Sequence, residues 1–342
     1  MRIKTLLAGA TAFAVLAGAA QALTVNVVGN LGITTQSKTL EAPFWTEKLP
    51  ALSGGEITAN FKPWNEMGLK GPEIYRLLGQ GVMNVATGQL GHSAGDVPIN
   101  DATDLAGLNP TIEEFKAVTE AMRPALEDYY AKEMGLELLT LQSYQAQILY
   151  CRDEFTGLAD LKGKKVRSSG ASQADFIEYF GGQAVAMAFG EVQQGLQQGV
   201  IDCAITGTLG GYSAKWHEGA KYLYTLPVNW GSGATMANKA WWDGLPEAQR
   251  TLIKTEMAKL EDEMWALNAR ENEIGVACNT TGPCPEGEPA GMVRVDPTPE
   301  DVELRRKAMI EAVLPGFKAR CGDACVELWN ANIGPVVGLT IE

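Results

Sequence analysis

The chain contains few histidines and few basic residues. Two histidines, His92 and His217, occur in 342 residues, and neither has a partner at metal-ligand spacing, so we expect no metal and no cofactor. Lys and Arg number 28 against 41 Asp and Glu, a formal net charge of -13. Such an acidic chain repels polyanions, which argues against nucleic acid and anionic membrane surfaces as partners.

Long apolar runs are also absent after the first 22 residues, so no later segment is expected to cross a bilayer. The first 22 residues differ from the rest. Arg2 and Lys4 precede an apolar run at 6–19, and positions 20–22 fit a small-x-small cleavage site. This pattern predicts a signal peptide over residues 1–22 that is cleaved near Ala22 on export.

The six cysteines are even in number, which in an exported chain favours disulfides over metal or catalytic thiols. The pairings between cysteines close in sequence are Cys278 with Cys284 and Cys321 with Cys325. They leave Cys151 to pair with Cys203, both in predicted strands. Two alternatives stay open: a crossed pairing among the last four, and buried free thiols at 151 and 203.

The length suits two domains, and 46% hydrophobic with 20% charged residues is typical of a globular protein. Apolar alternation and short apolar runs predict strands at 24–28, 56–61, 136–141, 147–151 and 222–230. Helical spacing predicts helices at 38–49, 109–136, 246–273 and 298–319, the second of them with a new piece from Pro124.

One helix-to-strand unit occurs twice. Residues 73–86 align without a gap with residues 191–204, sharing a Glu, a Leu five residues later, Gln-Gly-Val and a final Ala. Recurring units indicate recurring architecture. The repeat therefore predicts two similar lobes.

Arg167 is the main candidate for ligand binding. It ends a short predicted strand and enters the turn at 168–170, ahead of a helix. Open α/β sheets bind ligands at such carboxyl ends of strands. A guanidinium matches a carboxylate with two parallel hydrogen bonds and keeps its charge. We therefore predict that Arg167 binds a carboxylate, and the competing interpretation is a surface salt bridge to one of the many acids.

Three segments together resemble one family. They read D-L-K-G-K-K-V-R at 160–167, M-A-F-G-E-V at 187–192 and L-Q-Q-G-V-I-D at 196–202. This series is similar to the pattern of the DctP-like solute-binding proteins of TRAP (tripartite ATP-independent periplasmic) transporters, roughly D-L-K-G-x-K-h-R, then an S-E-V-like helix start, then A-L-Q-x-G-x-V-D-G. The resemblance covers nearly the whole chain, including the signal peptide.

The resemblance implies an α/β, two-lobed periplasmic binding protein fold with crossing hinge strands and a long helix spanning both lobes. We place lobe I at 23–145 plus 232–262 and lobe II at 146–231 plus 263–342. The implied protein is a periplasmic monomer without enzyme activity. It closes on a small organic carboxylate and delivers it to an ion-gradient-driven TRAP membrane permease. Arg167 matches the family arginine that pairs with that carboxylate.

The chain also departs from the family pattern. Thr206 stands where many relatives have a ligand-contacting asparagine, and a second arginine is replaced by Gln145 or Gln147. The loss of polar family positions favours an apolar or aromatic monocarboxylate over a sugar acid. Trp64 and Trp230 end strands in opposite lobes, which fits a sandwich around such a ligand or ordinary core packing. The remaining candidates lie at strand ends, in turns or beside the crossing strand: Asn30, Thr87, Gln89, Tyr144, Ser168 and Ser169.

Two other functions fit parts of the sequence. Residues 91–95 (Gly-His-Ser-Ala-Gly) match G-x-S-x-G, which makes a secreted α/β-hydrolase-type esterase the alternative. That motif needs a helix directly after the serine, where this chain has Pro98 and turn formers, and Asp202 and His217 would have to complete the triad. A sensor subunit that uses the same binding fold to report to a membrane kinase is the third hypothesis.

Overall fold

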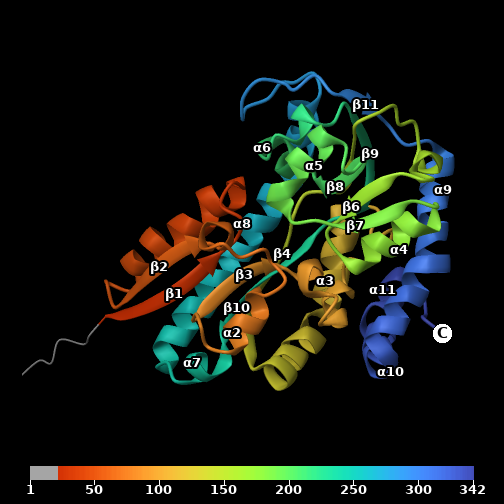
Figure 1. The fold of residues 1–342 in the computed structure, drawn as a ribbon. Coiled ribbons are helices and arrows are strands. Elements are labelled where there is room, and N and C mark those ends of the chain that lie inside the picture. Colours follow the sequence, from red (N-terminus) through yellow and green to blue (C-terminus); the bar gives the residue numbers. More distant parts are fainter. Residues whose placement is uncertain (1–21) are drawn as a thin grey trace, which may run out of the picture.

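Two separate β-sheets form the frame of the molecule (Figure 1). The computed structural model describes residues 22–342. Of the predicted signal peptide, residues 1–21 lie outside the described part, so its cleavage stays a prediction. Within the described residues the predicted two-lobed α/β fold is confirmed, with one sheet for each lobe.

The first sheet has the strand order β2-β1-β3-β10-β4. β1 pairs in parallel with β2 and β3, whereas β10 runs antiparallel between β3 and β4. The strands are β1 (Leu23–Gly29), β2 (Ile57–Pro63), β3 (Val85–Gln89), β4 (Leu136–Ser143) and β10 (Ser232–Asn238). In β1 the predicted alternation is visible over residues 24–27, where exposed Thr24 and Asn26 alternate with buried Val25 and Val27, because one face of the strand packs on the core. In β2 only the end residues Ile57 and Pro63 are buried.

The second sheet has the order β11-β9-β5-β8-β6-β7. β6 is parallel to β7 and β8, and β5 is antiparallel to β8 and β9. The strands are β5 (Gln147–Cys151), β6 (Lys165–Ser168), β7 (Gln183–Ala186), β8 (Cys203–Gly207), β9 (Tyr222–Asn229) and β11 (Val293–Val295). Every residue of β5 and β8 is buried, because both faces of these central strands are covered.

Three segments cross from one sheet to the other. Residues 144–146 join β4 to β5, and residues 230–231 join β9 to β10. The third is helix α8 (Glu247–Asn279), whose 33 residues extend about 50 Å at the usual rise. Trp265 of α8 donates its indole N–H to Leu141 O of β4 at 2.9 Å, and Asn279 donates to Thr208 O, next to β8, at 2.8 Å. The long helix therefore packs on both halves of the molecule.

Helix α8 approaches α6 (Thr208–Ser213) at Gly275. A Cβ atom at this position would lie 2.3 Å from Leu209 N. Glycine is therefore required for the close contact between the spanning helix and the segment that follows β8.

The repeated helix-to-strand unit is confirmed. Its first copy forms α2 (Ile74–Gly79) followed by β3, and its second copy forms α5 (Val192–Gln198) followed by β8. The two copies lie in different sheets, as the sequence repeat predicts.

The predicted break at Pro124 is wrong. Helix α3 runs without interruption over Ile112–Tyr129, and a capping box between Thr111 and Glu114 fixes its start. Proline removes one backbone donor, but buried residues on both sides of it, including Met122 and Leu126, hold the helix against the core.

The remaining helices are short or lie near the C-terminus. They are α1 (Leu49–Leu52), α4 (Ala171–Tyr179), α7 (Lys239–Asp243), α9 (Pro299–Ala308), α10 (Leu314–Asn332) and α11 (Gly334–Val337). Single turns of 3-10 helix include Trp64–Met67, Leu90–Ser93, Pro98–Asp101, Leu158–Leu161, Phe189–Glu191 and Trp216–Glu218. Wider π-type turns occur at Gln36–Glu41, Phe44–Lys48, Tyr130–Met134 and Met309–Val313.

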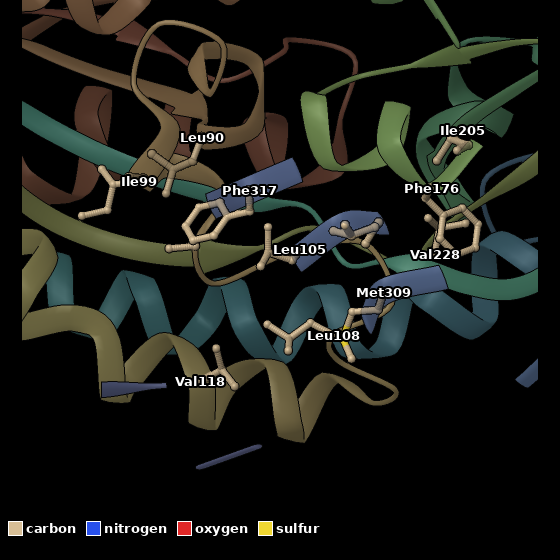
Figure 2. Packing of buried hydrophobic residues seen from close by; sticks show 14 of the residues in the cluster. Leu90, Ile99, Leu105, Leu108, Val118, Phe176, Ile205, Val228, Met309 and Phe317 are labelled. Atoms are coloured by element: carbon tan, nitrogen blue, oxygen red, sulfur yellow. The ribbon is translucent and has the colours of Figure 1, made fainter. Parts of the chain in front are cut away.

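The largest hydrophobic cluster joins both sheets to the C-terminal helices. Figure 2 shows Phe317 of α10 beside Leu90 and Ile99, and Met309 beside Leu108. Trp329 of α10 also donates its indole N–H to Ala102 O at 3.0 Å. All strands of each sheet fall inside the ranges that we assigned to one lobe. Helix α10, assigned to lobe II, packs on residues 98–108, assigned to lobe I. The lobe boundaries therefore stay a prediction.

The three predicted disulfides are confirmed. Cys151–Cys203 joins directly opposed residues of β5 and β8, Cys278–Cys284 closes the end of α8, and Cys321–Cys325 lies within α10. The crossed pairing and the free-thiol alternatives do not hold.

Candidate ligand-binding site between the two sheets

A small enclosed space, the inner cavity, lies where the two sheets face each other. Its volume is ≈ 50 Å³. Its wall includes residues at the ends of β1, β3 and β8, in the 144–146 crossing segment and at the start of β5. The lining residues are Asn30, Leu31, Thr34, Trp64, Gln89, His92, Tyr144, Gln145, Gln147, Phe189, Thr206, Gly207 and Gly210. Both halves of the molecule therefore enclose it, as ligand-driven closure requires.

A larger, more open space, the outer cleft, adjoins the inner cavity. Its volume is ≈ 640 Å³, and His92 and Phe189 line both spaces. Lys70, Pro72, Gly91 and Gly95 line it from the first half. The second half contributes residues 167–171 and 186–189 together with Ala174, Glu178, Ala184 and Glu191. Arg167 thus faces the space between the two halves.

Arg167 is held by backbone carbonyls and not by an acid. Its Nε donates to Met187 O at 3.1 Å, and its Nη1 donates to Ile205 O at 2.7 Å. The guanidinium carbon lies 5.6 Å from the ring centre of Trp216, a cation–π distance. The side chain is 3% exposed. Burial lowers its pKa to about 10, so Arg167 stays charged at neutral pH.

No described carboxylate pairs with this buried cation. A charge removed from water without an opposite charge is costly, and a carboxylate with good geometry offsets that cost. The competing interpretation of Arg167, a surface salt bridge, does not hold among the described residues. The site is suited to a ligand that brings the anion itself.

Asn30 lines the inner cavity and carries a buried amide nitrogen that has no described hydrogen-bond partner. Its Oδ1 accepts hydrogen bonds from Tyr144 OH at 2.9 Å and from Leu31 N at 2.7 Å. These two donors fix the orientation of the amide. Its Nδ2 is then buried without a partner among the described residues. Such a group needs an acceptor, and the cavity that Asn30 lines is where a ligand oxygen can supply one.

Gln145 and Gln147 line the cavity with their amide nitrogens engaged elsewhere. Nε2 of Gln145 donates to Asn268 Oδ1 at 2.9 Å and to Glu271 Oε2 at 2.7 Å. Nε2 of Gln147 donates to Gln145 O at 2.9 Å. The amide oxygens carry no described hydrogen bond, so the two glutamines can act as acceptors. Thr206, at the end of β8, adds a hydroxyl to the same wall.

His92 and Phe189 line both spaces, and the sequence analysis did not select either residue as a ligand contact. Burial first, and then the charge of Arg167, lower the pKa of His92 to about 3, so its imidazole is neutral. Trp64 meets His92 edge to face at 6.5 Å between ring centres. His92 follows the end of β3 by three residues, and Phe189 lies two residues before the second copy of the repeated unit. These locations, after a strand and before the repeated unit, are the sequence signals from which the two residues could have been selected.

Trp230 and Thr87 do not line either space. Trp230 is packed in a hydrophobic cluster and donates its indole N–H to Asn109 O at 3.1 Å. The expected sandwich with Trp64 is therefore not formed. The hydroxyl of Thr87 lies 2.9 Å from that of Thr235 on the neighbouring strand β10. Gln89 lines the inner cavity, and Ser168 and Ser169 line the outer cleft.

A chain of hydrogen bonds links the crossing segment at 230–231 to the turn that follows Arg167. Asp104 accepts from Trp230 N at 2.9 Å and from Gly231 N at 2.6 Å, and also from Asn229 Nδ2 at 2.8 Å. The Oδ1 of Asn229 accepts from Gln173 Nε2 at 2.8 Å. Finally, Gln173 Oε1 accepts from the backbone N–H of Ser169 at 2.8 Å. These hydrogen bonds connect the 230–231 crossing segment to the turn that follows Arg167.

The esterase alternative is contradicted. Ser93 ends a single 3-10 turn, another 3-10 turn begins at Pro98, and no helix follows the serine. Its hydroxyl donates to Leu90 O at 3.0 Å and accepts from Asn100 Nδ2 at 2.7 Å. The supposed triad acid, Asp202, accepts from Lys165 N, and His217 stacks on Tyr212. The residues of the supposed triad are thus engaged elsewhere.

Two further searches cover residues 22–342. In that range no three of His, Cys, Asp and Glu gather in a way that could hold a metal ion. None of the helices there combines the length and apolar character needed to span a bilayer.

Two α/β halves, three crossing segments and two adjoining spaces between the halves define the class: a two-lobed solute-binding protein. The outer of these spaces is lined by a buried, unpaired cation, Arg167. The chain belongs to family 7 of the bacterial extracellular solute-binding proteins, the DctP family, whose model matches residues 31–313. This family is non-enzymatic, and membership confirms the resemblance found in the three sequence segments.

Individual relatives agree with the family assignment. The chain is 30% identical over 159 residues to the ectoine-binding periplasmic protein TeaA of Halomonas elongata, covering 46% of this chain and 45% of TeaA. It is 27% identical over 257 residues to the 2,3-diketo-L-gulonate-binding periplasmic protein YiaO of Escherichia coli, covering 73% and 76%. The match spans about half the length or less of the first three curated relatives.

Solved structures show the same fold at low sequence identity. A Bordetella pertussis extracytoplasmic solute receptor that binds pyroglutamic acid, DctP7, matches with a TM-score of 0.80 and 21% identity, covering 91% of this chain and all of that one (100%). A TRAP periplasmic solute-binding protein from Rhodoferax ferrireducens with bound malonate matches with a TM-score of 0.81 and 19% identity, covering 92% and 98%.

Proposed function

We propose that this protein is the periplasmic solute-binding component of a TRAP transporter. It captures a small organic carboxylate between its two lobes and delivers it to an ion-gradient-driven membrane permease. Arg167 anchors the carboxylate, and closure about the crossing segments engages the other end of the ligand. Family membership and the carboxylates named for its relatives, among them pyroglutamate, malonate and orotate, support this proposal.

The observation that carries the proposal is the unpaired charge of Arg167. A buried guanidinium with Nε and Nη1 bonded to carbonyls is oriented but not neutralised. A ligand carboxylate would complete its hydrogen bonds and balance its charge in one step. Export to the periplasm rests on the predicted signal peptide and on the periplasmic relatives.

A carboxylate screen followed by calorimetry tests the proposal. Thermal shift against a carboxylate library identifies ligands, because a ligand of the folded state raises the melting temperature. Titration of Arg167→Ala with a hit should then show affinity lowered by at least about 30-fold, or about 2 kcal/mol. Lys165→Ala, an exposed cation on the same strand, is the matched control and should bind as the wild type does. Unchanged binding by Arg167→Ala would reject the anchor.

Delivery to a permease requires a separate assay. Uptake of the identified ligand into vesicles that contain the partner permease should require the binding protein and an ion gradient, and it should proceed without ATP. A binding protein that co-purifies with a membrane kinase and supports no uptake would instead be a sensor.

A further inference from the structure

The inner cavity has no cationic side chain in its wall, because its one histidine, His92, is neutral. Its thirteen lining residues include neither Lys nor Arg. The two cations that line the outer cleft are Arg167 and Lys70. Lys70 has a 67% exposed side chain that lies 3.4 Å from Glu191. Arg167 is therefore the one buried cation available to a ligand among the described residues of these two walls.

Two buried carboxyl groups lie directly behind the opposite part of the wall. Glu41, 1% exposed, accepts the backbone N–H of Asn30 at 2.8 Å through Oε2. Glu271, 3% exposed, accepts from Gln145 Nε2 at 2.7 Å through Oε2. Neither glutamate lines the cavity, but each bonds to a residue that does.

These carboxyls lack close compensating cations. Burial raises the pKa of Glu41 to about 7, and no cation acts to lower it. Burial also raises the pKa of Glu271, and the one cation that acts on it, Arg270, is exposed on the outer side of α8. This part of the wall is therefore negative when the glutamates are ionised and neutral when they are protonated. It is positive in neither state.

We infer that the ligand carries a single carboxylate, bound at Arg167, and that its other end is an uncharged polar group whose oxygen accepts a hydrogen bond from Asn30 Nδ2. This inference rests on the proposed function and adds to it the net charge of the ligand and the place of that charge. Glu41 and Glu271 act as specificity-determining residues that do not touch the ligand. They exclude dicarboxylates by placing negative charge behind the amides that meet the far end of the ligand.

Physical chemistry supports the exclusion. A second carboxylate would be removed from water at a point where it meets no cation. It would either repel the ionised glutamates at short range or force protonation of one of the groups. A carboxamide of the same shape meets neither cost, and its oxygen satisfies the unpartnered Nδ2 of Asn30.

Acid and half-amide pairs test the inference, because each pair differs by one charge at nearly constant shape. Malonate is compared with malonamate, succinate with succinamate, and glutarate with glutaramate, all by calorimetric titration at about pH 8, where the pKa of Glu41 leaves it mainly ionised. We expect the best-fitting half-amide to bind at least about tenfold more tightly than its diacid. A diacid that binds equally well or better overturns the inference, and so does a complete absence of binding by all three half-amides at millimolar concentration.

Glutamine variants identify the source of the discrimination. Glu41→Gln keeps an acceptor for Asn30 N, and Glu271→Gln keeps one for Gln145, so both preserve the local hydrogen bonds. In each variant the ratio of half-amide affinity to diacid affinity should fall by about threefold or more, because the diacid binds more tightly. Glu256→Gln, a buried glutamate of α8 that pairs with Lys48 and Lys259 away from the cavity, should leave the preference unchanged. If neither Glu41→Gln nor Glu271→Gln alters the preference for the half-amide, the glutamates do not set that preference.

The same titrations separate this inference from the proposed function. Arg167→Ala should abolish measurable binding of whichever member of a pair binds the wild type. If the wild type binds diacids tightly and Arg167→Ala does not bind them, Arg167 is the carboxylate anchor. In that case only the inference about ligand charge fails. If Arg167→Ala binds every probe normally, the proposed function fails as well.

Discussion

Tyr144 and Asn30 illustrate how one residue prepares another for a ligand. The Tyr144 hydroxyl donates to Asn30 Oδ1, and the Nδ2 of this cavity-lining residue is buried without a described partner. Because Tyr144 belongs to the 144–146 crossing segment and Asn30 follows β1, the contact also ties the crossing segment to the first sheet.

Tyr144→Phe should therefore weaken ligand binding. The loss of one hydrogen bond that orients the amide predicts an affinity about fivefold lower, or about 1 kcal/mol. Titration with a ligand found by the carboxylate screen measures this loss. Tyr75→Phe is the matched control, since the Tyr75 hydroxyl donates to Gly88 O and Ala234 O and does not line the inner cavity. It should lower stability and leave affinity unchanged, and equal affinity losses in both variants would contradict the role given to Tyr144.

At single positions, the sequence predicted strand-end residues better than residues placed by tertiary packing. Arg167, Asn30, Gln89 and Thr206 line the two spaces because the end of a strand fixes where they lie. Trp230 also follows a strand, but the 109 region covers its ring, and no local pattern reveals that contact. The same holds for His92 and Phe189, whose place in the wall depends on how turns from opposite halves meet.

At the scale of elements, the pair β5 and β8 forms the centre of the second sheet. Cys151 and Cys203 are opposed on these strands, and their disulfide encloses the chain that forms β6, α4, β7 and α5. The strand carrying Arg167 lies next to β8. The cross-link therefore restrains the part of the unfolded chain that supplies the anchor.

Replacement of Cys151 and Cys203 by Ala should lower the free energy of unfolding by about 4 kcal/mol, given the loop entropy for their separation of 52 residues. Replacement of Cys321 and Cys325, separated by 4 residues, should cost about 2 kcal/mol on the same basis. Denaturant unfolding of both double variants measures the difference. A smaller loss for the longer loop would show that chain entropy does not dominate here.

Element boundaries were predictable where burial alternates or where a helix has clear end signals. β5 occupies the predicted residues 147–151, and α8 begins within a residue of the predicted start. The continuity of α3 through Pro124 was not predictable from local rules, because packing of α3 on the core outweighs one lost backbone bond.

At the scale of the whole molecule, buried acids link stability to pH. Burial raises the pKa of Asp101, Asp104 and Glu41 to about 7. Between about pH 4 and pH 7 the folded protein therefore keeps protons that the unfolded chain has released, and the free energy of unfolding falls as the pH rises. His92 has the opposite effect, since its pKa is lowered to about 3 and the unfolded chain binds that proton below about pH 6.5. Three acids outweigh one histidine, so the net change is a fall.

Asp101→Asn should make this pH dependence less steep. Asp101 accepts the backbone N–H of Ser172, at the start of α4, and an amide oxygen can replace it there. The slope between about pH 5 and pH 7 should decrease by up to about 1.4 kcal/mol per pH unit, the value for one proton. Urea unfolding at several pH values gives both slopes. Identical slopes for the variant and the wild type would show that Asp101 does not hold a proton in the folded state.

The crystal structure of the protein with its bound ligand tests the central claim most directly. The account predicts a ligand enclosed between the two sheets, with both oxygens of one carboxylate about 2.8 Å from guanidinium nitrogens of Arg167 and an uncharged oxygen at Asn30 Nδ2. A ligand whose acid group points away from Arg167, or one bound outside the space between the sheets, would contradict it.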